Sequence, residues 1–201
     1  MKKEKFINRY KNKLPVAAGT VFLLTVVFAV ASAWISGIHL YDLGISFSSY
    51  VGLDYPISVV WFAAAVIVLA MMTIYIIKTK MPAAKRIVYA IIFLCIFGTA
   101  LFPFNAYSKH PTELTIDIHN TIAVILMLAT TVSFVLSAVM AGSRGQHIAA
   151  VLSLVYSAAF IALYFMRFTP LFRTFFIWEN VFIVLLILEL HMEQYGEKQS
   201  A

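Results

Sequence analysis

Long apolar runs, separated by shorter polar connections, dominate the chain. An apolar stretch of about 20 residues is long enough to cross the hydrocarbon core of a bilayer as an α-helix. The pattern therefore predicts an all-α membrane protein, built as a bundle of six transmembrane helices. The predicted spans are about 14–37, 57–77, 87–102, 118–141, 148–166 and 175–191.

The predicted domain organisation is a six-helix transmembrane domain, residues 14–192, between a basic tail, 1–13, and a polar tail, 193–201. A basic stretch before an apolar run also begins a signal peptide, and the segment 31–33 resembles a cleavage site. The first run is longer than the apolar core of a signal peptide. We therefore expect it to be an uncleaved first span.

Lysine and arginine are unevenly divided between the two sides that six crossings define. The side of the termini carries the basic tail, the basic segment 78–86 and Arg144, whereas the other side carries Lys109, Arg167 and Arg173. Cytoplasmic loops of membrane proteins are enriched in such residues. The distribution predicts that both termini are cytoplasmic and that the protein crosses the cell membrane several times.

Composition supports a membrane protein, because 62% of the residues are hydrophobic and only 12% are charged. A soluble domain is about half apolar and about a quarter charged. The net charge of +6 lies largely beside the first span, which indicates membrane lipids as partners and no nucleic acid. The single cysteine, Cys95, cannot form an internal disulfide. No ligand spacing typical of a cofactor is present, so we expect none.

Small and hydroxyl residues recur at helical spacing in three of the predicted spans. Such faces allow helices to approach closely. We expect them to pack helices together, within one chain, in a homo-oligomer or against another membrane protein through helices one, four and five. The residues are Ala29, Ala33 and Gly37, then Thr130, Ser133 and Ser137, then Ala150, Ser153 and Ser157.

A polar passage, residues 102–121, ends at the start of the fourth span with Asp117, His119 and Asn120. His119 and Asn120 can border one cleft on a helix. Asp117 lies about 200° from His119 and faces elsewhere if the helix already includes it. In one interpretation Asp117 caps the helix, Asn120 bonds a neighbouring helix and His119 lies at the membrane interface. In the other, His119 lines an outward-facing site as a ligand-binding, proton-carrying or metal-ligating group.

Glu179 lies about one turn inside the predicted sixth span, and Arg167 and Arg173 precede it on the same side. Carboxylates within spans usually face the bundle and find a partner. An ion pair that ties helix five to helix six is one interpretation. The other is that Glu179 joins His119 in contacting a substrate or a cation.

Asp54 and His39 belong to the predicted first outer loop and complete the candidate ligand-binding residues. Metal sites usually leave recognisable ligand spacings, and none occurs in this chain. We therefore expect no metal. The residues that would be best suited to one are His119, Asp117 and Glu179.

Four ionisable residues lie toward the predicted cytoplasmic ends of helices five and six: His147, Glu189, His191 and Glu193. Because a helix end there meets water, we expect these side chains to be solvated and not to form a site. Haem would need histidines that face one another inside the bundle, and the sequence does not provide them.

Three short segments resemble one known group of proteins: Phe102-Pro103, His119-Asn120 and the segment 41–44. Together with the six spans, they resemble the Frag/DRAM/Sfk-like membrane proteins and a related bacterial six-helix family of unknown function. Asn105 stands where that pattern has an acidic residue. The resemblance implies six helices, cytoplasmic termini and an outer cleft near His119.

The function expected from the sequence is binding without catalysis. An outward-facing polar cleft would bind a lipid head group or a small polar ligand, with Arg167 and Arg173 on an anionic group and with Asn120 and His119 orienting it. The alternative is an intramembrane lipid hydrolase or transferase, in which His119 acts as base with a nearby carboxylate, with or without a metal ion. A small transporter is the third hypothesis, and the sequence leaves open whether the protein is an enzyme.

Overall fold

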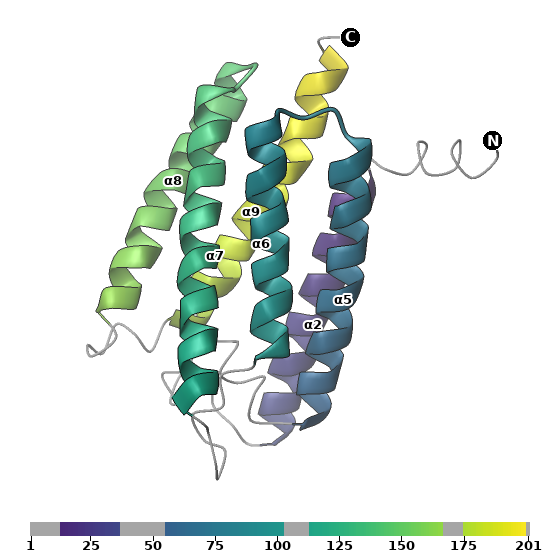
Figure 1. Ribbon diagram of the computed structural model, residues 1–201, viewed down its shortest axis with the longest axis vertical. Coiled ribbons are helices and arrows are strands. Elements are labelled where there is room, and N and C mark those ends of the chain that lie inside the picture. The colour runs from purple at the N-terminus through teal and green to yellow at the C-terminus, as the bar shows by residue number, and fades with distance from the viewer. Residues whose placement is uncertain (1–12, 37–54, 103–112, 167–174, 200–201) are drawn as a thin grey trace, which may run out of the picture.

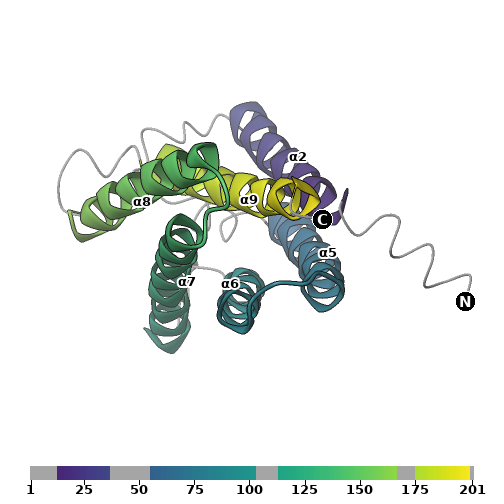
Figure 2. The same ribbon diagram turned by 90° about the horizontal axis from the view of Figure 1, so that it is seen from above.

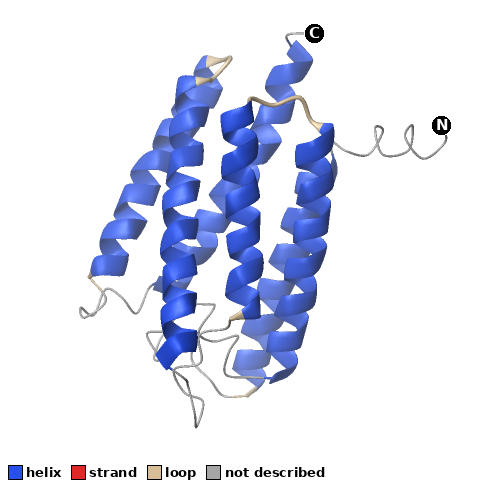
Figure 3. Ribbon diagram, viewed as in Figure 1, coloured by secondary structure: helices blue, strands red, loops and turns tan. Residues whose placement is uncertain are grey.

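The computed structural model describes residues 13–36, 55–102, 113–166 and 175–199, and this part of the chain contains only α-helices and short connections (Figure 3). Counted over the residues that the structure describes, five of these helices are long and apolar enough to cross a membrane. The chain is thus an all-helical, membrane-embedded protein. The helices are α2 (Leu14–Ile35), α5 (Tyr55–Lys78), α6 (Ala83–Leu101), α7 (Glu113–Val139), α8 (Arg144–Phe165) and α9 (Phe175–Gln199) (Figure 1).

The six helices coincide with the six apolar runs, but several ends differ from the prediction. Pro56 is the second residue of α5, and α6 ends at Leu101, one residue before the predicted end of the third span. However, α7 begins at Glu113 and not near 118, and α9 continues through 193–199, which were expected to form a polar tail. Hydropathy marks the segment that suits lipid, whereas a helix can continue past that segment into water.

Consecutive helices run up and down, and each packs against the next (Figure 1). The last helix, α9, packs between α8 and α2 and also contacts α7, so it closes the bundle (Figure 2). The start of α2 and the end of α9 lie at one end of the bundle, which we name the termini end. The connections from α5 to α6 and from α7 to α8 lie at the same end (Figure 1). The opposite end is named the far end.

Aromatic side chains fill much of the interior. The rings of Phe160 and Phe182 lie 4.8 Å apart between α8 and α9, and Phe134 of α7 meets Phe182 edge-on at 6.1 Å. On the other side of the bundle, Phe22 and Trp61 join α2 to α5 at 5.7 Å. Such pairs contribute about 0.5–1.5 kcal/mol each beyond their buried area. They fix the helices that carry the polar groups described below.

Two glycines mark close contacts between helices. A Cβ atom at Gly19 of α2 would lie 2.7 Å from Cγ2 of Ile187 on α9, and one at Gly98 of α6 would lie 3.1 Å from Cδ1 of Ile122 on α7. Both distances are shorter than ordinary van der Waals contact. The first contact holds α9 against α2, which fixes the path of α9 through the bundle.

The small and hydroxyl faces predicted from the sequence are buried inside this single chain, as expected for close helix packing. Gly37 lies outside the described residues. A homo-oligomer or a partner contact through these faces stays a prediction. The buried members are Ala29, Ala33, Thr130, Ser133, Ser137, Ala150, Ser153 and Ser157.

Candidate functional site

A carboxylate lies inside the bundle near the termini end. Glu189 of α9 is only 3% exposed, so the expectation that it would be solvated is wrong. The reason is its position on the helix, because Glu189 shares the inward face of α9 with Phe182 and Leu186, which are also buried. His147, in contrast, is exposed as expected, and the side chains of His191 and Glu193 lie outside the described part.

Three hydroxyl groups from two other helices donate hydrogen bonds to this carboxylate. The Ser133 hydroxyl lies 2.8 Å from Oε1 and 3.0 Å from Oε2 of Glu189. The Tyr89 hydroxyl donates to Oε1 at 3.3 Å, and the Ser137 hydroxyl donates to the same oxygen. A buried carboxylate is costly unless protein donors replace its water. Tyr89 of α6 and the two serines of α7 supply these donors.

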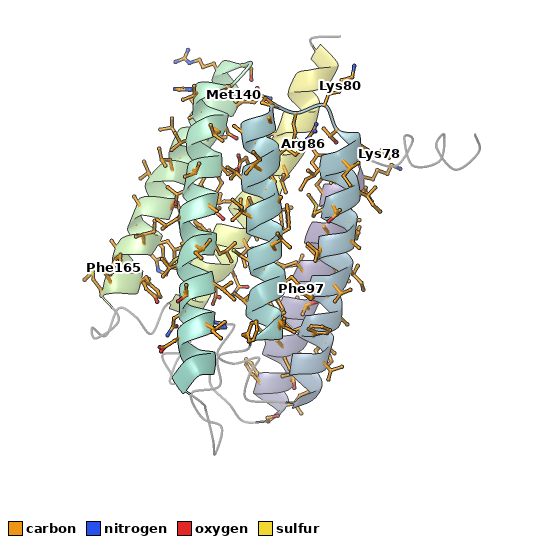
Figure 4. The ribbon with its side chains drawn as sticks, viewed as in Figure 1. Lys78, Lys80, Arg86, Phe97, Met140 and Phe165 are labelled. Carbon is orange, nitrogen blue, oxygen red and sulfur yellow. The ribbon has the colours of Figure 1, made fainter. Side chains whose placement is uncertain are left out.

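A buried lysine completes the group. Lys85 of α6 is 6% exposed, and its Nζ donates a hydrogen bond of 3.1 Å to the Ser137 hydroxyl. The Ser137 hydroxyl therefore links the ammonium of Lys85 to the carboxylate of Glu189. We name Lys85, Tyr89, Ser133, Ser137 and Glu189 the Glu189 cluster. The other basic residues of this segment are exposed at the termini end (Figure 4): Lys78, Lys80 and Arg86.

The Glu189 cluster forms part of the wall of a cavity at the termini end, with a volume of about 500 Å³. The wall comprises the connection from α5 to α6, the end of α7, the start of α8 and the inner face of α9. We name it the termini-end cavity. Its polar lining is Tyr75, Thr79, Lys80, Lys85, Ser137, Ser143, Gln146, Ser153 and Glu189, and its apolar lining includes Met81, Met140 and Met192.

Hydrogen bonds hold one side of this cavity in place. The Gln146 side chain donates from Nε2 to the Met192 carbonyl at 3.0 Å and accepts at Oε1 from the Gly142 amide at 3.0 Å. The Ser143 hydroxyl accepts from the Gln146 amide at 3.3 Å and so caps α8. These bonds tie the start of α8 to the last turns of α9. This side of the cavity wall is therefore held by hydrogen bonds between two helices.

Thr79 contributes a polar atom that the bundle does not use. Its hydroxyl oxygen is buried in the cavity wall and has no hydrogen-bond partner among the residues that the structure describes. Its backbone amide donates to the Tyr75 carbonyl at 2.9 Å, which extends the last turn of α5. A buried hydroxyl usually has a partner in a native protein.

His119 does not lie exposed at the membrane interface, as one interpretation expected, whereas the interpretation in which it lines an outward-facing site stays a prediction. His119 is 3% exposed, and its Nδ1 lies 2.6 Å from the Phe102 carbonyl. Since a carbonyl only accepts, the Nδ1–H donates, and the ring ties α7 to the end of α6. Asp117 is exposed and faces away from His119, as predicted for a helix that includes it. Its interpretation as a cap is wrong, because α7 already begins at Glu113.

The remaining candidates lie at the far end or outside the described residues. Asn120 and Glu179 are half-buried near the first turns of α7 and α9. Within the described ranges, no three His, Cys, Asp or Glu side chains are grouped to hold a metal ion. The predicted outer cleft stays a prediction, because four of its residues are not described: His39, Asp54, Arg167 and Arg173.

Sequence reasoning missed the residues of the Glu189 cluster as a site. One signal was available: Lys85 and Tyr89 are four residues apart, and so are Ser133 and Ser137, so each pair shares one helix face. Two such polar pairs on consecutive helices could have indicated a shared polar face. In its own helix Glu189 is also four residues from Glu193, but that spacing lies where the apolar run ends and does not indicate a buried face.

Comparisons with known proteins find no matching family model, no matching curated protein and no matching solved structure. The functional argument therefore rests on the Glu189 cluster and on the cavity beside it.

Proposed function

We propose that this chain is a six-span protein of the cell membrane, with both termini cytoplasmic, that binds a small polar or amphiphilic ligand in the termini-end cavity. One observation carries the proposal: Lys85 and Glu189, both buried, lie in the wall of a cavity of about 500 Å³. Ionisable side chains at membrane depth are costly and commonly mark functional sites. Ligand pockets have volumes of about 300–1,000 Å³.

The orientation is supported by the charges of the described side chains. The described parts of the far end carry no lysine or arginine side chain. The lysines and arginines whose side chains are described all lie at the termini end, and they are Lys13, Lys78, Lys80, Lys85, Arg86 and Arg144. The positive-inside rule then places the termini end in the cytoplasm. With 25 residues, α9 is about 37 Å long, enough to serve as the sixth crossing.

A reporter fused to the carboxyl terminus tests this orientation. We expect the reporter to be inaccessible to an impermeant label in intact cells and accessible after the membrane is permeabilised. Labelling in intact cells would refute the cytoplasmic placement of the termini and of the cavity mouth.

Binding is a better account of the Glu189 cluster than a purely structural role. Replacing buried charged groups by apolar residues is often neutral or stabilising, so stability alone is a weak reason to bury Lys85 and Glu189 near each other. The cavity beside Lys85 and Glu189 provides room for a ligand that uses their charges. The hydrolase or transferase and the transporter stay predictions, since no contact of the described residues favours them over binding.

Filling the cavity tests the proposed function. Ser153 lines the cavity, whereas its neighbour Leu152 is 64% exposed on the lipid-facing side of α8. We expect native mass spectrometry of the full chain in a mild detergent to detect the same bound small molecule in the wild type and in Leu152→Phe. Ser153→Phe should lose it, because the phenyl ring would project into the cavity and overlap the bound molecule. Equal occupancy in Ser153→Phe, folded by its thermal unfolding curve, would refute ligand binding in this cavity.

A further inference from the structure

We propose that the termini-end cavity binds the phosphate group of its ligand, with Lys80, Lys85 and the Thr79 hydroxyl as the contacting groups. This inference rests on the proposed function and names the chemical class of the ligand. Two sources can supply such a group in this place. One is the phosphodiester of a lipid in the adjoining leaflet, and the other is phosphate dissolved in the cytoplasm.

The charge of the cavity wall favours an anion. Its described lining carries two cations, Lys80 and Lys85, and one carboxylate, Glu189, which leaves one net positive charge. A phosphodiester carries one negative charge and would neutralise the wall. A cationic ligand would increase the imbalance in a partly desolvated space, where like charges repel more strongly than in water.

Two helix N-termini add to the positive potential. The starts of α6 and α8 both border the cavity, and neither helix has an acidic residue in its first turn. The start of α6 also has no side-chain cap, and its first turn carries Lys85. Cations near a helix N-terminus are unfavourable, whereas an anion there is stabilised by the unpaired backbone amides. An anion in the cavity would offset the repulsion between Lys85 and the positive end of the α6 helix dipole.

The negative charge of Glu189 does not prevent anion binding. Its Oε1 accepts from Tyr89, Ser133 and Ser137, so protein hydroxyls already surround the charge. The link through Ser137 also holds the Lys85 ammonium at the wall. In this arrangement Glu189 positions Lys85 and does not itself contact the phosphate.

The remaining lining suits the part of a lipid next to its phosphate. Met81, Met140 and Met192 lie around the same cavity as the two lysines. Methionine side chains are flexible and apolar, and adapt to irregular aliphatic groups. Basic pockets between membrane helices on the cytoplasmic side commonly hold anionic lipid head groups.

The test uses the purified full chain in a neutral detergent. Phosphatidylglycerol and inorganic phosphate are titrated separately, and binding is followed by the shift of the thermal unfolding midpoint. We expect a saturable stabilisation that Thr79→Val and Lys80→Met each weaken about tenfold, the effect of one lost hydrogen bond to a charged group. Thr79→Val removes no hydrogen bond that the described residues make. Lys78→Met is the matched control, since Lys78 is exposed at the end of α5 outside the cavity lining.

The outcomes separate the two sources and the two proposals. Stabilisation by phosphatidylglycerol but not by inorganic phosphate identifies the lipid, and the reverse identifies the dissolved anion. Equal binding in Thr79→Val, Lys80→Met and Lys78→Met would overturn the phosphate site, because Thr79 and Lys80 would then contribute no more than an exposed lysine outside the cavity. A cationic or uncharged molecule that is bound by the wild type and lost in Ser153→Phe would overturn this inference and leave the proposed function standing.

Discussion

Removing the Glu189 side chain is the most direct test of the cluster around it. Glu189→Ala leaves the hydroxyls of Tyr89, Ser133 and Ser137 without their carboxylate acceptor. A buried donor without an acceptor costs about 1–3 kcal/mol, so three of them set an upper range of about 3–9 kcal/mol. Serine hydroxyls in a helix can instead donate to a backbone carbonyl of the preceding turn, which recovers part of this cost.

We therefore expect Glu189→Ala to lower the free energy of unfolding by about 3–4 kcal/mol, since Tyr89 has no such local acceptor and Lys85 loses its counter-charge. In a chain of 201 residues this corresponds to a fall of about 10 °C in the unfolding midpoint. Glu189→Gln keeps the shape and one acceptor oxygen, so it should cost less. Leu188→Ala, on the exposed side of the same helix, is the control and should cost under about 1 kcal/mol.

A double-mutant cycle with Ser133→Ala separates the hydrogen bonds from general packing. Unfolding by a denaturing detergent in mixed micelles gives the free energies of the wild type, of both single variants and of the double variant. Because Ser133 contacts both carboxylate oxygens, we expect a coupling energy of about 1–2 kcal/mol. Zero coupling, or a cost for Glu189→Ala no larger than that of Leu188→Ala, would show that the carboxylate is not held as described.

Two further predictions concern helix packing and use the same unfolding assay. Gly19→Val should lower the free energy of unfolding by about 1–3 kcal/mol, because the new side chain overlaps Ile187. Shortening Ile187 in the double variant Gly19→Val/Ile187→Ala should recover part of the loss. An unchanged unfolding midpoint for Gly19→Val would contradict the close contact. His119→Phe should lower the free energy of unfolding by about 1–3 kcal/mol, because the Phe102 carbonyl loses its donor. Asp117→Asn, at an exposed position, should be nearly neutral. A larger loss for Asp117→Asn than for His119→Phe would refute the buried histidine.

The fold was largely predictable, because lipid imposes a strong constraint. A chain in hydrocarbon must satisfy its backbone groups within each segment, so long apolar runs become helices. The runs near 57–77 and 118–141 correspond to α5 and α7 within a few residues at most ends. The ends themselves were less predictable, as 113–117 and 193–199 show. Those segments are polar enough for water and still continue their helices, and hydropathy does not report helix formation outside the membrane.

The inward faces were harder to predict than the helices. In a soluble protein the apolar stripe of a helix marks its buried face. In α9 both faces are apolar, with Leu188 exposed and Leu186 buried, so the sequence gives no such stripe. Small and hydroxyl residues at helical spacing indicate the buried face when an apolar stripe is absent. On this basis Ser133 and Ser137 were correctly assigned to a buried face. Glu189, near the end of its apolar run, was assigned to water because most carboxylates at such positions are solvated.

The Glu189 cluster escaped prediction because its residues are ambiguous one helix at a time. A pair such as Ser133 and Ser137 has two uses, close packing against a neighbour and hydrogen bonding to a buried charge, and both give the same four-residue spacing. Only the partner helix distinguishes them. Here the contact of Gly19 with Ile187 holds α9 against α2, and the carboxylate of α9 lies against α6 and α7. The site therefore depends on the path of the last helix, which follows from tertiary packing and not from any local pattern.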